Sequence, residues 1–217
     1  MRETLVKEFE KAKIMAIFKE TSGDDLIKAV QALKDGGIRF FEVVYSQKKE
    51  DKSSTLEAIS LLRKTFPDLY IGCGTVLNVE QLHMAQKAGA QFAVAPSVCK
   101  EVIEEAHRFD MMFIPGATTS TEVVHAYDEC KADIVKLFPA GTMGIPYAKQ
   151  LMYPLNHVKF LATSQMTVEL FEEFLKIGFV GAGLRSQLYN DDMIKNGQFE
   201  EITKNAKQYV EIAEKYN

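Results

Sequence analysis

The sequence has few of the features that mark several protein classes. Only three of its 217 residues are cysteines, Cys73, Cys99 and Cys130, and no two of them stand in the C-x-x-C spacing of a metal or redox motif. An odd, widely spaced set of thiols is typical of a reduced cytosolic protein and not of a disulfide framework. We therefore interpret the cysteines as small apolar fillers and expect a cytoplasmic protein.

The sequence also has only a small excess of charge of one sign. The chain carries 26 basic and 30 acidic residues, a net charge of −4, which argues against a nucleic-acid-binding surface. No apolar run approaches the length of a membrane span. The first residues, MRETLVKEFEKAK, form a charged amphipathic helix without the apolar core of a signal peptide. These absences predict a soluble protein that binds neither nucleic acid nor a membrane.

Signals for a metal or a cofactor are weak. His83, His107 and His125 fall in expected helices and His157 precedes an expected strand, and none stands with acidic residues at metal-ligand spacing. Gly72 and Gly74 begin like a dinucleotide-binding loop, but the remaining glycine of that motif is missing. We expect no metal site and no cofactor.

Strand and helix patterns alternate along the whole chain. Short runs that are apolar on both faces are typical of buried parallel strands, and each is followed by a segment with apolar residues at helical spacing. The expected strands span residues 14–18, 38–44, 69–74, 91–96, 111–116, 133–139, 158–163 and 179–183. Nothing resembles a linker. We predict an α/β fold, a single (β/α)8 TIM barrel over residues 1–217 with an N-terminal helix, ahead of a doubly wound open sheet.

Helix boundaries are predicted from capping residues. Asn78 precedes the helical pattern of residues 79–88 and has a side chain suited to the N-cap. Ser54 and Glu57 have the spacing of a capping box, which predicts a helix start at Ser54.

In such a barrel the active site lies at the carboxyl ends of the strands. Two residues of the expected strands point to chemistry, Glu42 in the second and Lys136 in the sixth, within ADIVKLFPAGTMG. A lysine is seldom buried, because an ammonium leaves water only at a cost. Burial lowers the pKa of a lysine and leaves part of it as a neutral amine. Such an amine attacks a ketone to give a Schiff base, and a nearby carboxylate can shuttle the protons. The alternative is a buried structural ion pair.

Nearly the whole chain resembles the KDPG/KHG aldolases, class I aldolases of 2-keto-3-deoxy-6-phosphogluconate and 4-hydroxy-2-oxoglutarate. The matching segments are GGIRFFEV, GCGTVLNVEQ, AGAQFAVAPSV, IPGATTSTEV and DIVKLFPAGTMG. The resemblance implies that Lys136 forms a Schiff base with pyruvate and that Glu42 shuttles protons. It also implies that Thr75 binds the pyruvyl group, that Pro96 shapes the pocket, and that the protein is a homotrimer. A metal-dependent aldolase is disfavoured by the scattered histidines.

The chain departs from the family's pattern around the rest of the site. Where the family places an arginine for the substrate carboxylate, this sequence has Lys19 and Ser46; Lys19 is either a substitute ligand or a solvated rim residue. The family's PTGG becomes Ala162–Gln165 and its GVGS becomes Gly183–Ser186. Those glycines hold substrate phosphate in the family, so we expect poor preference for phosphorylated substrates. The predicted substrate-binding residues are Lys19, Thr75, Pro96, Phe138, Thr163, Ser164, Gln165, Arg185 and Ser186.

Two hypotheses of different classes follow. The first is a lyase of carbohydrate metabolism that cleaves a 2-keto-3-deoxy sugar acid or a 4-hydroxy-2-oxo acid, with or without a 6-phosphate, to pyruvate and an aldehyde. The second is a catalytically degenerate barrel that binds a sugar acid as a sensor or scaffold. Intact Lys136 and Glu42 favour the first, and the altered anion site favours the second.

Overall fold

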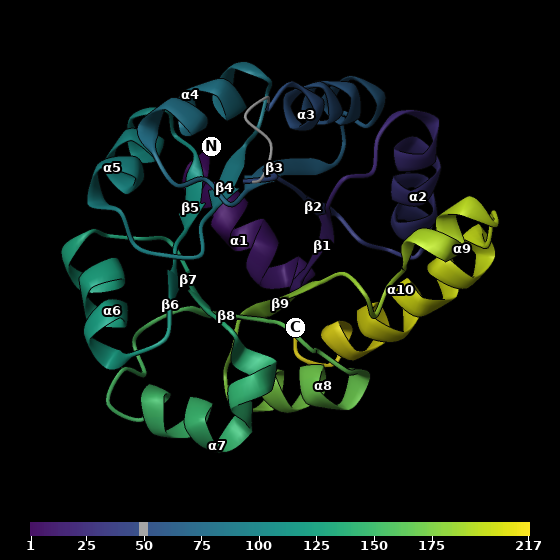
Figure 1. Ribbon diagram of the computed structural model, residues 1–217. Helices are drawn as coiled ribbons and strands as arrows, with labels where there is room; N and C mark the ends of the chain where they lie inside the picture. The colour runs from purple at the N-terminus through teal and green to yellow at the C-terminus, as the bar shows by residue number, and fades with distance from the viewer. Residues whose placement is uncertain (48–51) are drawn as a thin grey trace.

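The computed structural model describes residues 1–47 and 52–217 and shows a nearly closed barrel of parallel strands surrounded by helices (Figure 1). The (β/α)8 prediction is therefore confirmed. The strands are β1 (Ile14–Phe18), β2 (Phe40–Val44), β3 (Tyr70–Gly74), β4 (Phe92–Val94), β5 (Met112–Ile114), β6 (Gly116–Ala117), β7 (Val135–Leu137), β8 (Phe160–Thr163) and β9 (Gly181–Leu184).

The nine strands occupy eight positions around the barrel. Their order is β5-β4-β3-β2-β1-β9-β8-β7-β6, and the two end strands are halves of one chain segment interrupted only by Pro115. Proline has no N–H to donate to a strand ladder, which explains the interruption. The Pro115 carbonyl still accepts a 2.8 Å hydrogen bond from the Lys136 backbone N–H. The segment thus pairs with β4 through its first half and with β7 through its second half.

The helices form an outer ring, apart from the first (Figure 1). They are α1 (Arg2–Ala12), α2 (Gly23–Asp35), α3 (Ser53–Thr65), α4 (Val79–Lys87), α5 (Lys100–Arg108), α6 (Ser120–Val124) with the π-helix η1 (His125–Glu129), α7 (Ala140–Met152), α8 (Val168–Lys176), α9 (Asp191–Lys195) and α10 (Phe199–Glu214). No helix in the described part of the chain is long and apolar enough to cross a membrane.

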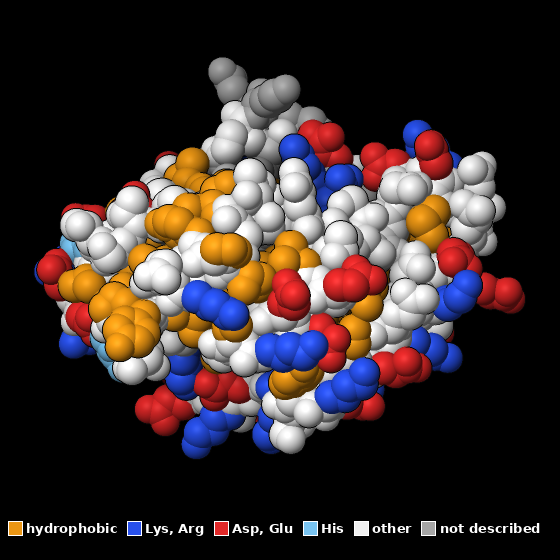
Figure 2. Space-filling model, turned by 90° about the horizontal axis from the view of Figure 1, so that it is seen from below, with side chains coloured by type: hydrophobic (Ala, Val, Ile, Leu, Met, Phe, Trp, Pro, Cys, Tyr) orange, Lys and Arg blue, Asp and Glu red, His pale blue; other side chains and the backbone are white. Residues whose placement is uncertain are grey.

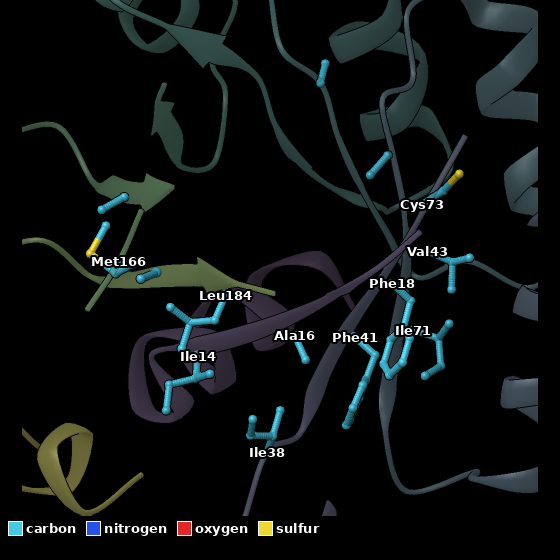
Figure 3. Packing of buried hydrophobic residues seen from close by; sticks show 14 of the residues in the cluster. Ile14, Ala16, Phe18, Ile38, Phe41, Val43, Ile71, Cys73, Met166 and Leu184 are labelled. Carbon is cyan, nitrogen blue, oxygen red and sulfur yellow. The ribbon is translucent and has the colours of Figure 1, made fainter. Parts of the chain in front are cut away.

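The strands bury both of their faces, and this divides the core in two. One set of alternate residues packs outward against the helices; Figure 3 shows Ile14, Ala16 and Phe18 of β1 beside Phe41 and Val43 of β2. The other set fills the barrel interior, where side chains from five strands and Ile134, just before β7, meet the apolar face of α1. This inner core comprises Leu5, Val6, Phe9, Met15, Phe40, Phe92, Val94, Met112, Ile114, Ile134 and Leu161.

Helix α1 closes the amino-terminal end of the barrel. Its apolar residues Leu5, Val6 and Phe9 belong to the inner core, and Phe9 meets Phe40 edge-to-face with ring centroids 5.1 Å apart. At its surface, Lys159 at the start of β8 forms a 2.7 Å ion pair with Glu10. With this end filled by apolar side chains, the carboxyl ends of the strands are left as the face where a polar site can form.

Candidate active site

Glu42 and Lys136 lie on opposite walls of the barrel. Their strands, β2 and β7, are four positions apart in a ring of eight. Side chains alternate along a strand, and the residues two positions earlier, Phe40 and Ile134, belong to the inner core. Glu42 and Lys136 therefore also point inward, one layer above that core. Two long side chains from opposite walls converge on the barrel axis at its carboxyl end.

The layer of side chains beneath them is apolar. Met15, Phe40, Phe92, Met112, Ile134 and Leu161 are all fully buried. An apolar floor of this kind excludes water from below and makes the electrostatic interactions above it stronger than they would be in water.

Glu42 is a buried carboxyl with a free oxygen. The residue is 2% exposed, and within the described part of the chain its Oε2 has no hydrogen-bond partner. Burial raises the pKa of Glu42, and the charge of Lys136 opposes that rise. Among the described residues no ion pair joins this carboxyl to Lys136, and its Oε2 stays without a partner. A structural ion pair, the alternative left open by the sequence, is therefore not what the structure shows.

Space for this carboxyl depends on Gly74 at the end of β3. A Cβ built on Gly74 would lie 1.9 Å from Oε1 of Glu42 and 2.7 Å from its Cδ. Any other residue would collide with the carboxyl group. The second glycine of the GCG motif is thus explained by the position of Glu42.

Lys136 is half-buried and contacts an aromatic ring. Its Nζ lies 5.2 Å from the ring centroid of Phe138, the residue directly after β7. Phe138 is 42% exposed at the mouth of the barrel. The structure thus places the two predicted site residues of the KLFP motif in direct contact.

Thr163 and Thr75 lie on either side of this centre. Thr163, at the end of β8, is 3% exposed and donates a 3.4 Å hydrogen bond to the Leu137 carbonyl, next to Lys136. Thr75 follows β3 in a left-handed conformation, φ 59°, and is half-buried. Pro96 follows β4 and is exposed at the mouth. All three predicted residues are at the carboxyl ends of strands.

The loop after β8 keeps a glycine-like backbone without glycines. Ser164 and Gln165 have φ values of 82° and 48°, in the left-handed region that side chains disfavour. Helix α7 packs closely on this loop, since a Cβ on Gly141 would lie 2.0 Å from the Ser164 carbonyl oxygen. The side chains that replace the family's glycines are therefore added to a turn whose conformation still suits glycine.

Arg185 is held at the rim after β9. Its Nη2 donates a 3.3 Å hydrogen bond to Asp191, and its guanidinium lies 6.0 Å from the ring centroid of Tyr189. Its Nε is buried and has no partner among the described residues. Burial raises the pKa of Tyr189, against an opposing effect of Arg185. Ser186 follows as an exposed residue.

Lys19 is exposed at the rim, directly after β1. The structure places it at the carboxyl end of the barrel, as expected, but does not bring it into contact with Lys136 or Glu42. Both roles considered for Lys19, substrate ligand and solvated rim residue, are compatible with this position.

Sequence reasoning missed the residues that support the site. Asp191 and Tyr189 hold Arg185, and Thr118 and Tyr147 hold the exit of β7, where the Thr118 hydroxyl donates a 2.8 Å hydrogen bond to the Phe138 carbonyl. Thr118 stands in the IPGATTSTEV segment that carries the resemblance, so that segment held a signal for it. Asp191, the first residue of α9, lies outside the segments that carry the resemblance.

The histidines lie apart from this site and pair with carboxylates. His83 contacts Glu105 at 2.8 Å and His157 contacts Asp128 at 3.0 Å. In the described ranges, 1–47 and 52–217, no group of three or more histidine, cysteine and acidic side chains could hold a metal ion.

Cavity size alone does not locate the site. A cavity of about 590 Å³ lies outside the barrel, lined by side chains of α2, the end of α3 and the start of α10, among them Ile27, Phe66 and Phe199. It contains neither of the two inward-facing charged residues. The site at the carboxyl end is assigned from chemistry: a lysine, a carboxyl with a free oxygen, and a dry floor.

Comparison with known proteins shows the family of the chain. The family model "KDPG and KHG aldolase" matches residues 5–205. A 2-dehydro-3-deoxy-phosphogluconate aldolase of Treponema pallidum is 30% identical over 96% of this chain and 97% of its own length. The KHG/KDPG aldolase of Escherichia coli is 29% identical over 86% of this chain and 85% of its own.

A solved structure is similar throughout. The KDPG aldolase of Legionella pneumophila, with pyruvate captured at low pH as a covalent carbinolamine intermediate, superposes with a TM-score of 0.82 at 27% identity and covers 93% of this chain and 96% of its own. Family model, relatives and fold therefore agree, and the chain belongs to the KDPG and KHG aldolase family, as an aldolase and a carbon–carbon lyase.

Proposed function

We propose that this enzyme is a Schiff-base aldolase that cleaves a 4-hydroxy-2-oxo acid to pyruvate and an aldehyde. The observation that carries the proposal is the pair of inward-facing groups, Lys136 and a buried Glu42 that has a free oxygen and no ion-pair partner. A carboxyl group committed to a structural ion pair could not exchange protons with a substrate. A carboxyl whose pKa is raised by burial is suited to accept and return such protons.

The steps follow from the positions of these two groups. The Lys136 amine attacks the 2-keto carbon to give a carbinolamine, and loss of water gives a protonated imine. The C3–C4 bond then breaks, its electrons move into the imine to form an enamine, and Glu42 takes the proton of the C4 hydroxyl. The aldehyde leaves, Glu42 returns its proton to C3 of the enamine, and water releases pyruvate from Lys136.

Around the imine, the proposed ligands are those at the carboxyl ends of the strands. Thr75 and Thr163 flank the centre and supply hydroxyls to the pyruvyl group. Lys19 is the nearest rim cation in sequence to β1 and is assigned to the substrate carboxylate. The distal part of the substrate extends toward Ser164, Gln165 and Arg185, with Ser186 at the rim and Pro96 shaping the opposite side.

Trapping of the imine tests the proposal. The protein is incubated with pyruvate and borohydride, and the modified peptide is mapped by mass spectrometry. We expect one pyruvyl adduct on Lys136, with Lys19 as an internal control that stays unmodified. An adduct on another lysine, or none, would sink the proposal. Glu42→Gln should trap slowly and turn over roughly 10² to 10⁴-fold more slowly than wild type; a wild-type rate would make Glu42 a structural residue.

We also propose that the enzyme assembles as a homotrimer through the sides of its barrels. Figure 2 shows apolar side chains gathered on one side of the molecule, toward the end of the view where α6 and α7 lie. Helix α7 has a single charged residue, Lys149, and Tyr153 directly after it is 86% exposed. An apolar exposed face of this kind marks an association surface. Light scattering at micromolar concentration should give three times the chain mass, and Ile145→Glu should reduce it; a wild-type monomer would remove the assignment.

A further inference from the structure

The charge of Lys136 has an unusual neighbour. No carboxylate of the described residues forms an ion pair with it, and its coulombic effect falls on Glu42 of β2, across the barrel. The contact at closest range is the face of the Phe138 ring, whose centroid is 5.2 Å from Nζ. A cation at this distance from a ring centroid is attracted by the ring's quadrupole.

Packing does not explain the position of this ring. Phenylalanine is usually buried, yet Phe138 is 42% exposed, whereas the phenylalanines on the strands below, such as Phe40 and Phe92, are fully buried. Phe138 lies two residues after Lys136, directly beyond the end of β7, and its ring faces the lysine, whose Nζ lies over it. The ring is thus exposed to solvent on one side and applied to the lysine on the other.

The backbone that carries the ring is fixed by side chains. The last paired residues of β6 and β7 are Ala117 and Leu137. One position further, the Thr118 hydroxyl donates a 2.8 Å hydrogen bond to the Phe138 carbonyl, and the Tyr147 hydroxyl donates a 2.5 Å hydrogen bond to the Thr118 carbonyl. Thr118 therefore extends the pairing of the two strands as far as Phe138.

We propose that Phe138 is a catalytic residue whose ring face stabilises positive charge on Nζ of Lys136 and on the imine nitrogen that replaces it, and that Thr118 is its positioning residue. This inference rests on the proposed function. The imine must be protonated to accept the electrons of the C3–C4 bond. When the bond breaks, those electrons neutralise the nitrogen, and the C4 hydroxyl proton goes to Glu42. Protonation of C3 then restores the cation beneath the ring.

The size of the effect follows from the contact. A partly exposed cation–π contact contributes about 0.5 to 1 kcal/mol. By 1.36 kcal/mol for each pH unit, this is a shift of roughly 0.4 to 0.7 pH unit in the titration of the amine, or about two- to fivefold. The direction of this pH shift distinguishes two explanations. Loss of the ring makes the amine lose its proton at lower pH, whereas merely admitting water to a buried amine makes it hold its proton to higher pH.

The test measures the free enzyme first. The full chain is acetylated briefly with acetic anhydride over a range of pH, and modification of the Lys136 peptide is quantified by mass spectrometry. In Phe138→Leu the midpoint for Lys136 should fall by roughly 0.4 to 0.7 pH unit, and in Phe138→Tyr, which keeps a ring, it should stay within experimental error. Phe109→Leu, the same change at the end of α5, is the matched control and should leave the midpoint unchanged.

Two further variants test the positioning role. Thr118→Val removes the hydroxyl at constant shape and should shift the midpoint in the same direction as Phe138→Leu but by less. Thr118→Ser keeps the hydroxyl and should restore the wild-type midpoint. An unchanged midpoint in Thr118→Val overturns the role of Thr118 and remains decisive if Phe138→Leu does not fold.

Pyruvate trapping in the same proteins separates the two proposals. A lowered midpoint in Phe138→Leu, with pyruvate trapped on Lys136 of the wild type, supports the role of the ring. An unchanged or raised midpoint overturns it, whether or not wild type traps pyruvate. A lowered midpoint in a protein whose wild type traps no pyruvate overturns both the imine role of Phe138 and the proposed function.

Discussion

Replacing Gly74 with alanine should displace the carboxyl group of Glu42. The added Cβ would lie 1.9 Å from Oε1, and an ordinary contact begins at 3.4 Å, so the carboxyl must retreat by 3.4 − 1.9 = 1.5 Å. Gly74 has no positive φ, so alanine itself fits the backbone. The fully buried Phe40 and Phe92 beneath leave little room for relaxation. We expect overpacking to destabilise the fold by about 1–3 kcal/mol.

The effect on turnover should exceed the effect on stability. A catalytic group displaced by about 1 Å can cost on the order of 10²-fold in rate. We therefore expect kcat/KM of Gly74→Ala to fall by roughly two orders of magnitude, with Lys136 still able to form the imine. Steady-state kinetics, thermal melting and borohydride trapping on the same samples separate these three quantities.

Shortening the acid should relieve the collision. Glu42→Asp withdraws the carboxyl by about one carbon–carbon bond, roughly 1.5 Å, so it should cost less in Gly74→Ala than in wild type. A coupling of about 0.5–3 kcal/mol is expected for groups in contact. Gly72→Ala is the matched control, because its Cβ would lie 2.3 Å from the Phe92 ring and not from the carboxyl. Wild-type turnover in Gly74→Ala, or equal rescue in Gly72→Ala, would refute the reasoning.

Three further predictions concern the buried acid and the distal loop. Burial raises the pKa of Glu42, so its contribution to stability is present below the pKa of the unfolded state and is lost as pH rises through the pKa of the folded state. Glu42→Gln should therefore become more stable than wild type as pH rises, measured by chemical denaturation from pH 4 to 9. Ser164→Gly should stabilise the fold by about 1 kcal/mol, because φ is 82°, whereas Ser60→Gly within α3 should destabilise it by a similar amount, as melting curves would show. The enzyme should discriminate poorly in favour of a phosphorylated keto acid over its unphosphorylated analogue in wild type and in Arg185→Ala; a preference of about a thousandfold, some 4 kcal/mol, would contradict this.

The order of strands and helices could be predicted because burial on both strand faces and helical spacing are local patterns. Asn78 was predicted as an N-cap, and its side chain accepts a hydrogen bond from the Gln81 N–H, 2.9 Å long. The capping box predicted at Ser54 and Glu57 was wrong: α3 begins at Ser53. A box does form at Thr119 and Glu122, where the start of α6 coincides with the spacing. Spacing alone does not say where the chain turns.

Other details depend on contacts between distant segments and could not be predicted. The interruption of the fifth strand depends on Pro115 facing β7, and the bend in α7 on Gly144, with φ 75°, ahead of Pro146. Lys136 and Glu42 were identified from residue type within strands, together with the family resemblance. Their separation was not predicted, because the length of a side chain does not fix where its charged end lies.

The surroundings of Glu42 on β2 and of Lys136 on β7 differ, and this difference explains why neither group is held in an ion pair. On the β2 wall, glycine at position 74 leaves the Glu42 carboxyl room but no hydrogen-bond donor for Oε2, so the carboxyl is buried without being fixed by a partner. On the β7 wall, Lys136 has an aromatic face instead of a carboxylate. A tight ion pair would hold the lysine protonated and the acid ionised, and neither could then begin the proposed reaction. Because no ion pair joins them, both groups stay available for the proposed reaction.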